Sequence, residues 1–212
     1  MRKSLAESWS CWKLSRITEL ERTGWSADTW LSHCRPEGQN DIRRALRCKW
    51  ESDEPARWLV WLMLNPSWAA EEHDDTTKRV TYYTMHWPEE RFDGWIAVNL
   101  SPQVNPDGAS FSSGTAGLAE AAKDDNLLDI AEAGAGAAKR VVAYGVSAIK
   151  SHRALVWSSI DALVRPVWCL GVNGKQQPYH PKRRAAIMTP SELADKVKVL
   201  PERVLGKRKR RI

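Results

Sequence analysis

The sequence predicts an α/β three-layer sandwich, in which a mostly parallel central sheet lies between helices on both sides. A continuous apolar run at residues 58–64 is typical of a strand buried on both faces, and further strands are expected at residues 95–100, 140–145 and 167–171. Segments with helical spacing separate the later runs, and alternation of strand and helix favours a parallel sheet. The chain has 212 residues, a length that suits one domain.

The segment before the first buried strand predicts an N-terminal helical arm, residues 1–41. Apolar side chains in residues 4–22 fall near one helical face, and residues 23–41 contain glycine and proline and predict an irregular connection. Residues 45–50 alternate between apolar and basic side chains and predict a half-buried strand. We expect this strand and residues 58–64 to form a hairpin at one side of the sheet.

Four segments carry helical patterns. Pro190 is compatible with the first turn of a short terminal helix, and glycines at 134 and 136 interrupt an earlier helical segment. The expected helices are residues 76–87, 118–138, 152–163 and 190–199. The expected organisation is therefore an arm (1–41), an α/β catalytic domain (42–205) and a basic tail (206–212).

Composition excludes several classes of protein. No apolar run approaches the ~20 residues of a membrane span, and the N-terminus lacks the apolar stretch of a secretory signal. No two of the four cysteines, at 11, 34, 48 and 169, have the C-x-x-C spacing, so a zinc or iron–sulfur site is disfavoured. We expect reduced thiols in a cytoplasmic protein that needs no membrane and no obligate protein partner.

Basic side chains are concentrated in two clusters. The net charge is +6, of which the tail supplies +5. Such a run is either a solvated tail or an arm that binds phosphate, and the second reading makes DNA the expected partner. The candidate DNA-binding residues are Lys182, Arg183, Arg184, Lys207, Arg208, Lys209, Arg210 and Arg211. The chain also has twelve tryptophans, most of them expected in the core and a few available for base stacking.

Polar residues or glycines follow each buried strand, where α/β proteins place their sites. Asn65-Pro66-Ser67 follows the first run and Asn99 ends the second, so both are expected at one cleft. The amide of Asn65 either faces the cleft or closes a local turn, and Ser67 can cap a helix.

Two further positions carry titratable side chains. Asp75 lies in an Asp-Asp-Thr-Thr run that either caps the next helix or turns a carboxylate toward the cleft to orient water. His180 lies on the loop after the last buried strand, where an imidazole can stabilise a leaving group whose negative charge rises in the transition state.

The ordered motifs resemble an uncharacterised prokaryotic family over residues 42–185. They are Leu62-Met63-Leu64-Asn65-Pro66-Ser67, Asp75-x-Thr77, Val98-Asn99-Leu100, Tyr144-Gly145 and His180-Pro181. The same layout is distantly similar to the uracil-DNA glycosylase superfamily. Leu62-Met63 departs from the glycine usual there, and Lys182-Arg183 replaces the usual Ser-Pro, which puts the minor-groove wedge in doubt.

The resemblance implies a DNA glycosylase that flips a base out of DNA and excises it without a metal or cofactor. It implies catalytic roles for Asn65, for His180 on a pyrimidine oxygen and for Asp75 as a helper of water. The substrate-binding residues would be Pro66, Ser67, Trp68, Tyr83 and Asn99, with Trp68, Tyr82 or Tyr83 stacking on the base. Excision of bulky modified bases from phage DNA, such as glucosylated hydroxymethylcytosine, is the implied biological role.

Two alternatives use the same sequence features. A nucleotide- or base-modifying transferase would need a soluble donor and would leave no abasic sites. A non-catalytic nucleic-acid-binding protein would depend on the tail and on exposed tryptophans, but not on Asn65 or His180.

Overall fold

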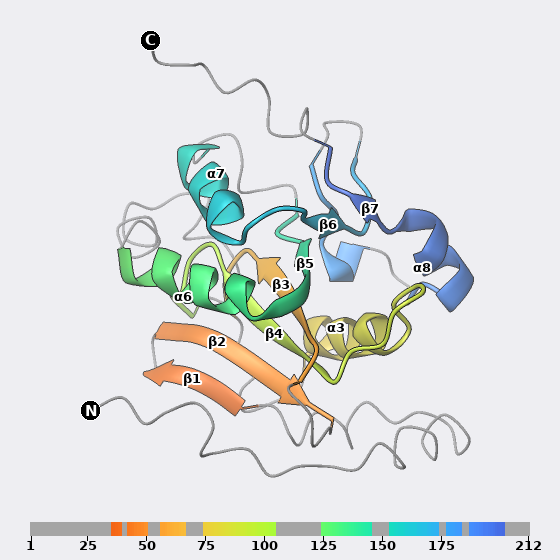
Figure 1. Ribbon diagram of the computed structural model, residues 1–212, viewed down its shortest axis with the longest axis horizontal. Coiled ribbons are helices and arrows are strands. Elements are labelled where there is room, and N and C mark those ends of the chain that lie inside the picture. Colours follow the sequence, from red (N-terminus) through yellow and green to blue (C-terminus); the bar gives the residue numbers. More distant parts are fainter. Residues whose placement is uncertain are drawn as a thin grey trace.

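The computed structural model describes residues 35–39, 42–50, 56–66, 74–104, 124–145, 153–173, 177–183 and 187–201. Within them, seven strands form one sheet in the order β1-β2-β4-β3-β5-β6-β7 (Figure 1). The strands are β1 (Arg35–Gln39), β2 (Ile42–Lys49), β3 (Trp58–Met63), β4 (Gly94–Asn99), β5 (Ala137–Val142), β6 (Trp168–Cys169) and β7 (Lys198–Val199). The helices are α3 (Asp75–Met85), α6 (Asp124–Ala135), α7 (Arg153–Ala162), α8 (Pro190–Lys196) and the 3-10 turn η2 (Pro181–Arg183).

The four central strands β4, β3, β5 and β6 run parallel, and the strands on both edges are antiparallel to their neighbours. Leu62 of β3 lies beside Val98 of β4 and Val142 of β5. These positions are buried, as expected for a parallel sheet covered on both faces. The predicted α/β class is therefore confirmed: the protein has a mixed sheet whose central strands are parallel.

Alternation along β3 divides the core into two layers. Val60 and Leu62 pack toward α6 and α7, in a cluster with Ile130 and Ile160. Leu59, Trp61 and Met63 belong to the other cluster, which includes Val80 of α3 and Leu193 of α8. Figure 1 shows the pair α6 and α7 apart from the pair α3 and α8, with the strands between them. Helices therefore cover both faces of the sheet.

The predicted hairpin between residues 45–50 and 58–64 is wrong. β2 pairs with β1 and β4, whereas β3 lies between β4 and β5. A strand apolar on both faces gains most when it lies in the centre of the sheet, and this gain overrides the preference of sequential strands for pairing. The half-buried β2 lies nearer the edge.

Several predicted boundaries also change. The connection predicted at 23–41 contains strand β1, and residues 4–22 lie outside the described residues. The helix predicted at 118–138 ends at Ala135, because the glycines at 134 and 136 are followed directly by β5. The helix predicted at 190–199 ends at Lys196, where the chain turns into β7. The helices predicted at 76–87 and 152–163 are confirmed within two residues at each end.

Within the described ranges, the helices are too short and too polar to cross a membrane. The buried Cys48 and Cys169 are not disulfide-bonded. No cluster of three or more metal-ligating side chains occurs in this part of the chain.

Candidate functional site

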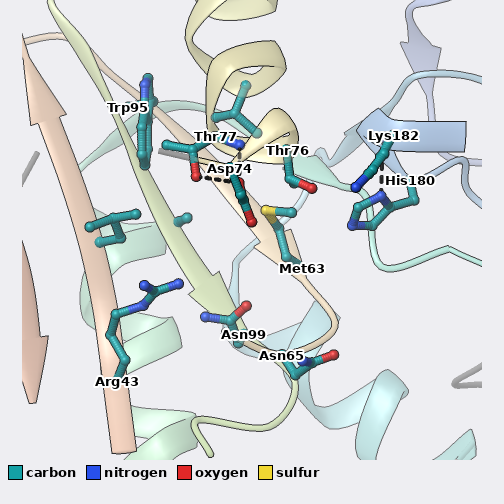
Figure 2. Close-up of a pocket in the computed structure, with 13 residues that line it drawn as sticks. Arg43, Met63, Asn65, Asp74, Thr76, Thr77, Trp95, Asn99, His180 and Lys182 are labelled. Carbon is teal, nitrogen blue, oxygen red and sulfur yellow. Dashed lines mark hydrogen bonds between the residues drawn. The ribbon is translucent and has the colours of Figure 1, made fainter. Parts of the chain in front are cut away.

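A cavity of about 210 Å³ opens at the carboxyl ends of β3 and β4, on the sheet face that α3 covers (Figure 2). This volume lies below the ~300–1,000 Å³ of typical ligand pockets, so the cavity suits a group about the size of one planar ring. The polar side chains that line it are Arg43, Asn65, Asp74, Thr76, Thr77, Asn99, His180 and Lys182. The structure therefore brings together Asn65, Asn99 and His180, which are far apart in the sequence.

Asn65 lies two residues after the last residue of β3 and is half-buried near the tip of the strand. Backbone hydrogen bonds from Leu100 to Met63 (2.9 Å) and from Ser101 to Leu64 (3.0 Å) continue the pairing of β4 with β3 up to this point. The side-chain Nδ2 donates to the carbonyl of the buried Pro66 at 3.2 Å. Asn65 thus makes the local contact of a turn and also lines the cavity.

Asp74, and not Asp75, is the carboxylate that lines the cavity. Asp74 caps α3: its Oδ1 accepts the backbone N–H of Thr77 at 2.7 Å and the Thr77 hydroxyl at 2.8 Å. Asp75 points outward, 64% of its side chain is exposed, and it pairs with Lys182 at 3.6 Å. The helix-cap interpretation of this run is confirmed, and the cap fixes Asp74 at the cavity wall.

His180 lies on the loop after β6. The hydrogen bond from the Tyr179 N–H to the Gly171 carbonyl (3.1 Å) holds the loop, as does the one from Arg79 of α3 to the Pro181 carbonyl (3.3 Å). Gly145, after β5, has a φ of +78°, and a Cβ there would lie 3.2 Å from the Cβ of His180. Glycine is favoured here because other residues are strained at this φ, and because the loop that carries the imidazole packs closely against this backbone.

The electrostatic surroundings keep the His180 imidazole neutral. Burial, together with the charges of Lys182 and Arg79, lowers its pKa to about 4, although Asp74 acts in the opposite direction. Nδ1 accepts the backbone N–H of Lys182 at 3.1 Å, so the proton of the neutral ring resides on Nε2. His180 is therefore a neutral hydrogen-bond donor at physiological pH.

Asn99 and Arg43 form the wall opposite His180 (Figure 2). Asn99 ends β4, and its carbonyl accepts the side-chain amide of Asn126 from α6 at 3.3 Å. Arg43 lies on β2 and its backbone N–H donates to the Pro102 carbonyl at 2.8 Å. The sequence analysis predicted Asn99 but not Arg43, and within the Asp74-Asp75 run it chose Asp75 as the carboxylate of the cleft.

The other predicted residues lie elsewhere. Tyr83 is buried behind the site; its hydroxyl accepts the Met188 N–H at 3.3 Å, and it lines a second cavity of about 260 Å³ that also reaches His180. Tyr82 packs on His86. Lys182 is exposed at the rim and Arg183 belongs to η2. Ser67, Trp68, Arg184 and the tail residues lie outside the described residues.

The fold and this cavity define an α/β protein with a polar site at the carboxyl edge of its parallel strands. Residues 43–182 match the family described as a protein of unknown function, DUF1643, and the chain belongs to this family. No curated protein and no solved structure matches the chain. The expected membership in an uncharacterised family over residues 42–185 is thereby confirmed, while the similarity to glycosylases stays a prediction.

Proposed function

We propose that the protein is a DNA N-glycosylase, which binds a nucleotide flipped out of DNA and hydrolyses the bond between its base and deoxyribose. The observation that carries the proposal is the neutral imidazole of His180 on the cavity that Asn65 and Asp74 also line. From the glycosylase resemblance we expect a modified base, such as one found in phage DNA.

Cleavage of the glycosidic bond leaves its electron pair on the base and gives the sugar oxocarbenium-like character. The negative charge that develops on the base is stabilised best by a hydrogen-bond donor that is already in place. The donor should also be neutral, so that no counter-ion competes for it. The Nε2–H of neutral His180 supplies such a hydrogen bond to an acceptor atom of the leaving base. The partly buried cavity strengthens this hydrogen bond relative to water.

Water must then attack C1′ of the sugar, and the proton that the water loses ends on the base anion, which leaves as the neutral free base. Asp74 is the carboxylate available for orienting that water, and its two hydrogen bonds from Thr77 hold it in place. Asn65 can bind the water or the base through its amide. In this proposal Asp74 takes the role that sequence reasoning gave to Asp75.

Contacts outside the cavity would offset the few kcal/mol that extrusion of the nucleotide costs. Lys182 is exposed at the rim, and its ion pair with Asp75 is between exposed groups and therefore weak. A phosphate can displace the carboxylate there. We propose the same function for the basic residues at 207–211, on the basis of their charge alone.

The test is formation of alkali-labile sites. The purified protein is incubated with unmodified DNA, uracil-containing DNA and DNA that carries glucosylated hydroxymethylcytosine. We expect abasic sites in at least one of them, and loss of this activity in Asn65→Ala and His180→Ala. Deletion of residues 207–212 should weaken binding in a salt-dependent way but leave cleavage at saturating DNA intact.

Failure to produce abasic sites in any DNA at high enzyme concentration would refute the proposal. A product that forms only with an added soluble donor would favour the transferase. Binding that depends on the tail but is indifferent to Asn65 and His180 would favour the non-catalytic protein.

A further inference from the structure

We infer that the second cavity binds the base next to the one held in the first cavity, so that the substrate is a DNA strand in which two neighbouring bases are unstacked. A single strand, or a strand that is opened locally, has this form. The inference deepens the proposed function and rests on it for the assignment of the ligand as DNA.

The second cavity, of about 260 Å³, adjoins the first. Among the described residues, His180 alone lines both cavities, so the two cavities meet at this side chain. Helix α3 also passes from one to the other, because Val80 lines the first cavity and Tyr83, almost one turn later, lines the second. Groups bound in the two cavities are therefore close enough to belong to consecutive nucleotides of one strand.

The walls of the second cavity suit a planar ring. Apart from Lys196, the residues that line it are aromatic or apolar, namely Tyr83, Leu170, Tyr179, His180, Pro181 and Met188. Tyrosine and histidine rings offer surfaces for stacking, and a methionine thioether makes favourable contacts with aromatic rings. The volume is similar to that of the first cavity and admits about one ring. These properties favour a nucleobase over a sugar or another strongly polar group.

Backbone contacts fix the aromatic walls in place. The Tyr179 N–H donates to the Gly171 carbonyl at 3.1 Å, and a Cβ on Gly171 would lie 3.4 Å from Cδ2 and Cε2 of the Tyr179 ring, which therefore lies close to the glycine backbone. The Met188 N–H donates to the Tyr83 hydroxyl at 3.3 Å and so connects the segment before α8 to α3. A cavity whose walls are held in this way loses less entropy when a ring binds.

A cation at the same cavity indicates that the ring belongs to an anionic ligand. Lys196, the last residue of α8, lines the cavity, is exposed and makes no ion pair within the described residues. Lys182 is exposed at the rim of the first cavity. A strand that crosses His180 with one base in each cavity carries its phosphates over this surface, where both lysines can bind them.

A site for two bases also favours one form of DNA. Extrusion from a duplex breaks pairing and stacking at each nucleotide, whereas a single strand loses only stacking. The cost of filling both cavities is therefore lower for a single strand than for an intact duplex.

The experiment measures equilibrium binding of dinucleoside monophosphates to the full-length protein by calorimetry. For each of thymidine, deoxycytidine, deoxyadenosine and deoxyguanosine, the dinucleotide is compared with two analogues, in which one base or the other is replaced by a tetrahydrofuran spacer. We expect at least one dinucleotide to bind roughly 5- to 150-fold more tightly than both of its analogues, the gain typical of stacking one further base. A protein with a single base-binding cavity would show only a statistical loss, because the remaining base would enter the same cavity.

Variants then assign the gain to the second cavity. Met188→Trp fills the cavity and should abolish the gain, whereas Met188→Leu nearly conserves the volume and should retain it. Tyr179→Ala removes an aromatic wall and should reduce the gain. Tyr82→Ala is the matched control, since Tyr82 packs on His86 outside both cavities. Thermal unfolding of each variant verifies folding, and the wild-type comparison needs no variant at all.

Equal binding of the dinucleotide and its analogues for all four bases, no binding of any dinucleotide, or a gain that survives in folded Met188→Trp would overturn the inference. Excision of bases from DNA that Met188→Trp leaves unchanged in rate and in affinity would overturn the inference alone. A gain that Met188→Trp abolishes, in a protein that excises no base, would overturn the proposed function alone.

Discussion

The two faces of the sheet differ in what fills them. The face under α6 and α7 holds mostly aliphatic side chains, and Gly134 of α6 approaches so closely that a Cβ there would lie 2.6 Å from the Leu163 carbonyl oxygen. The face under α3 and α8 holds tryptophan and tyrosine, and it carries the two cavities described above. Within the described residues, the first face is closely packed at Gly134, whereas the second leaves space at the strand ends.

Helix α3 supplies the hydrogen-bond acceptors for two buried indoles of the aromatic face. The indole N–H of Trp61 donates to Thr84 at 3.1 Å, and that of Trp95 donates to Thr81 at 3.0 Å. These threonines fix large rings without filling the space beside them. The comparison teaches that one face of the sheet can provide most of the stability while the other provides the site. Substitutions on the first face should therefore change the free energy of unfolding, and substitutions at the site should change activity.

The largest effect is expected from a cavity made on the face under α6 and α7. Ile160→Ala removes a fully buried side chain from the α6–α7 cluster and should lower the free energy of unfolding by about 2–5 kcal/mol. Chemical denaturation measures the loss. Any activity per folded molecule should be unchanged. A large fall in this activity would show that the face under α6 and α7 contributes to the site as well as to stability.

The next effect belongs to the aromatic face. If His180 donates to the leaving base, His180→Ala should lower the cleavage rate by about 10²–10³-fold, the loss typical of one transition-state donor. Single-turnover assays measure this at saturating enzyme. His86→Ala is the control, since that imidazole packs on Tyr82 outside the cavity. Full activity in His180→Ala would remove the imidazole from the mechanism.

Acidification should act on the same residue through stability. The folded pKa of His180 is about 4 and its ordinary value is 6.5, so the unfolded state binds the proton more readily. Stability from this group is present above pH 6.5 and is lost as pH falls toward 4, by roughly 3 kcal/mol at most. Denaturation curves of wild type and His180→Gln at pH 7 and pH 4.5 should differ in this loss. Equal losses of stability in wild type and His180→Gln would mean that titratable groups other than His180 cause the acid sensitivity.

The smallest effect is expected at α8, which lies over the aromatic face. Thr189 caps this helix: its hydroxyl accepts the Glu192 N–H at 3.3 Å, in a capping box. Thr189→Ala should cost about 1 kcal/mol of stability. Thermal unfolding should record a small shift with cleavage unaffected, whereas a loss of activity without a loss of stability would connect α8 to the site.

The sequence predicts the parts of this molecule that depend on local pattern. Strand β3 and the helices α3 and α7 follow from apolar runs and helical spacing, and the meeting of Asn65, Asn99 and His180 follows from the common edge of parallel strands.

Features set by tertiary pairing escaped prediction. The order of β2 and β3 depends on which strand gains most from central burial, and the direction of Arg43 depends on one bulge residue in β2. The exchange of Asp75 for Asp74 depends on where the first turn of α3 begins. No repeat or composition signal in the sequence marks these choices.

The central claim is that His180 and Asn65 act in one cavity to break the bond between a base and its sugar. Mass spectrometry of the small molecules released from DNA by the purified protein tests it most directly. The account predicts a free base in amounts equal to the abasic sites formed, and neither product from His180→Ala. A base that stays attached to its sugar in every DNA tested, or equal release by wild type and His180→Ala, would contradict it.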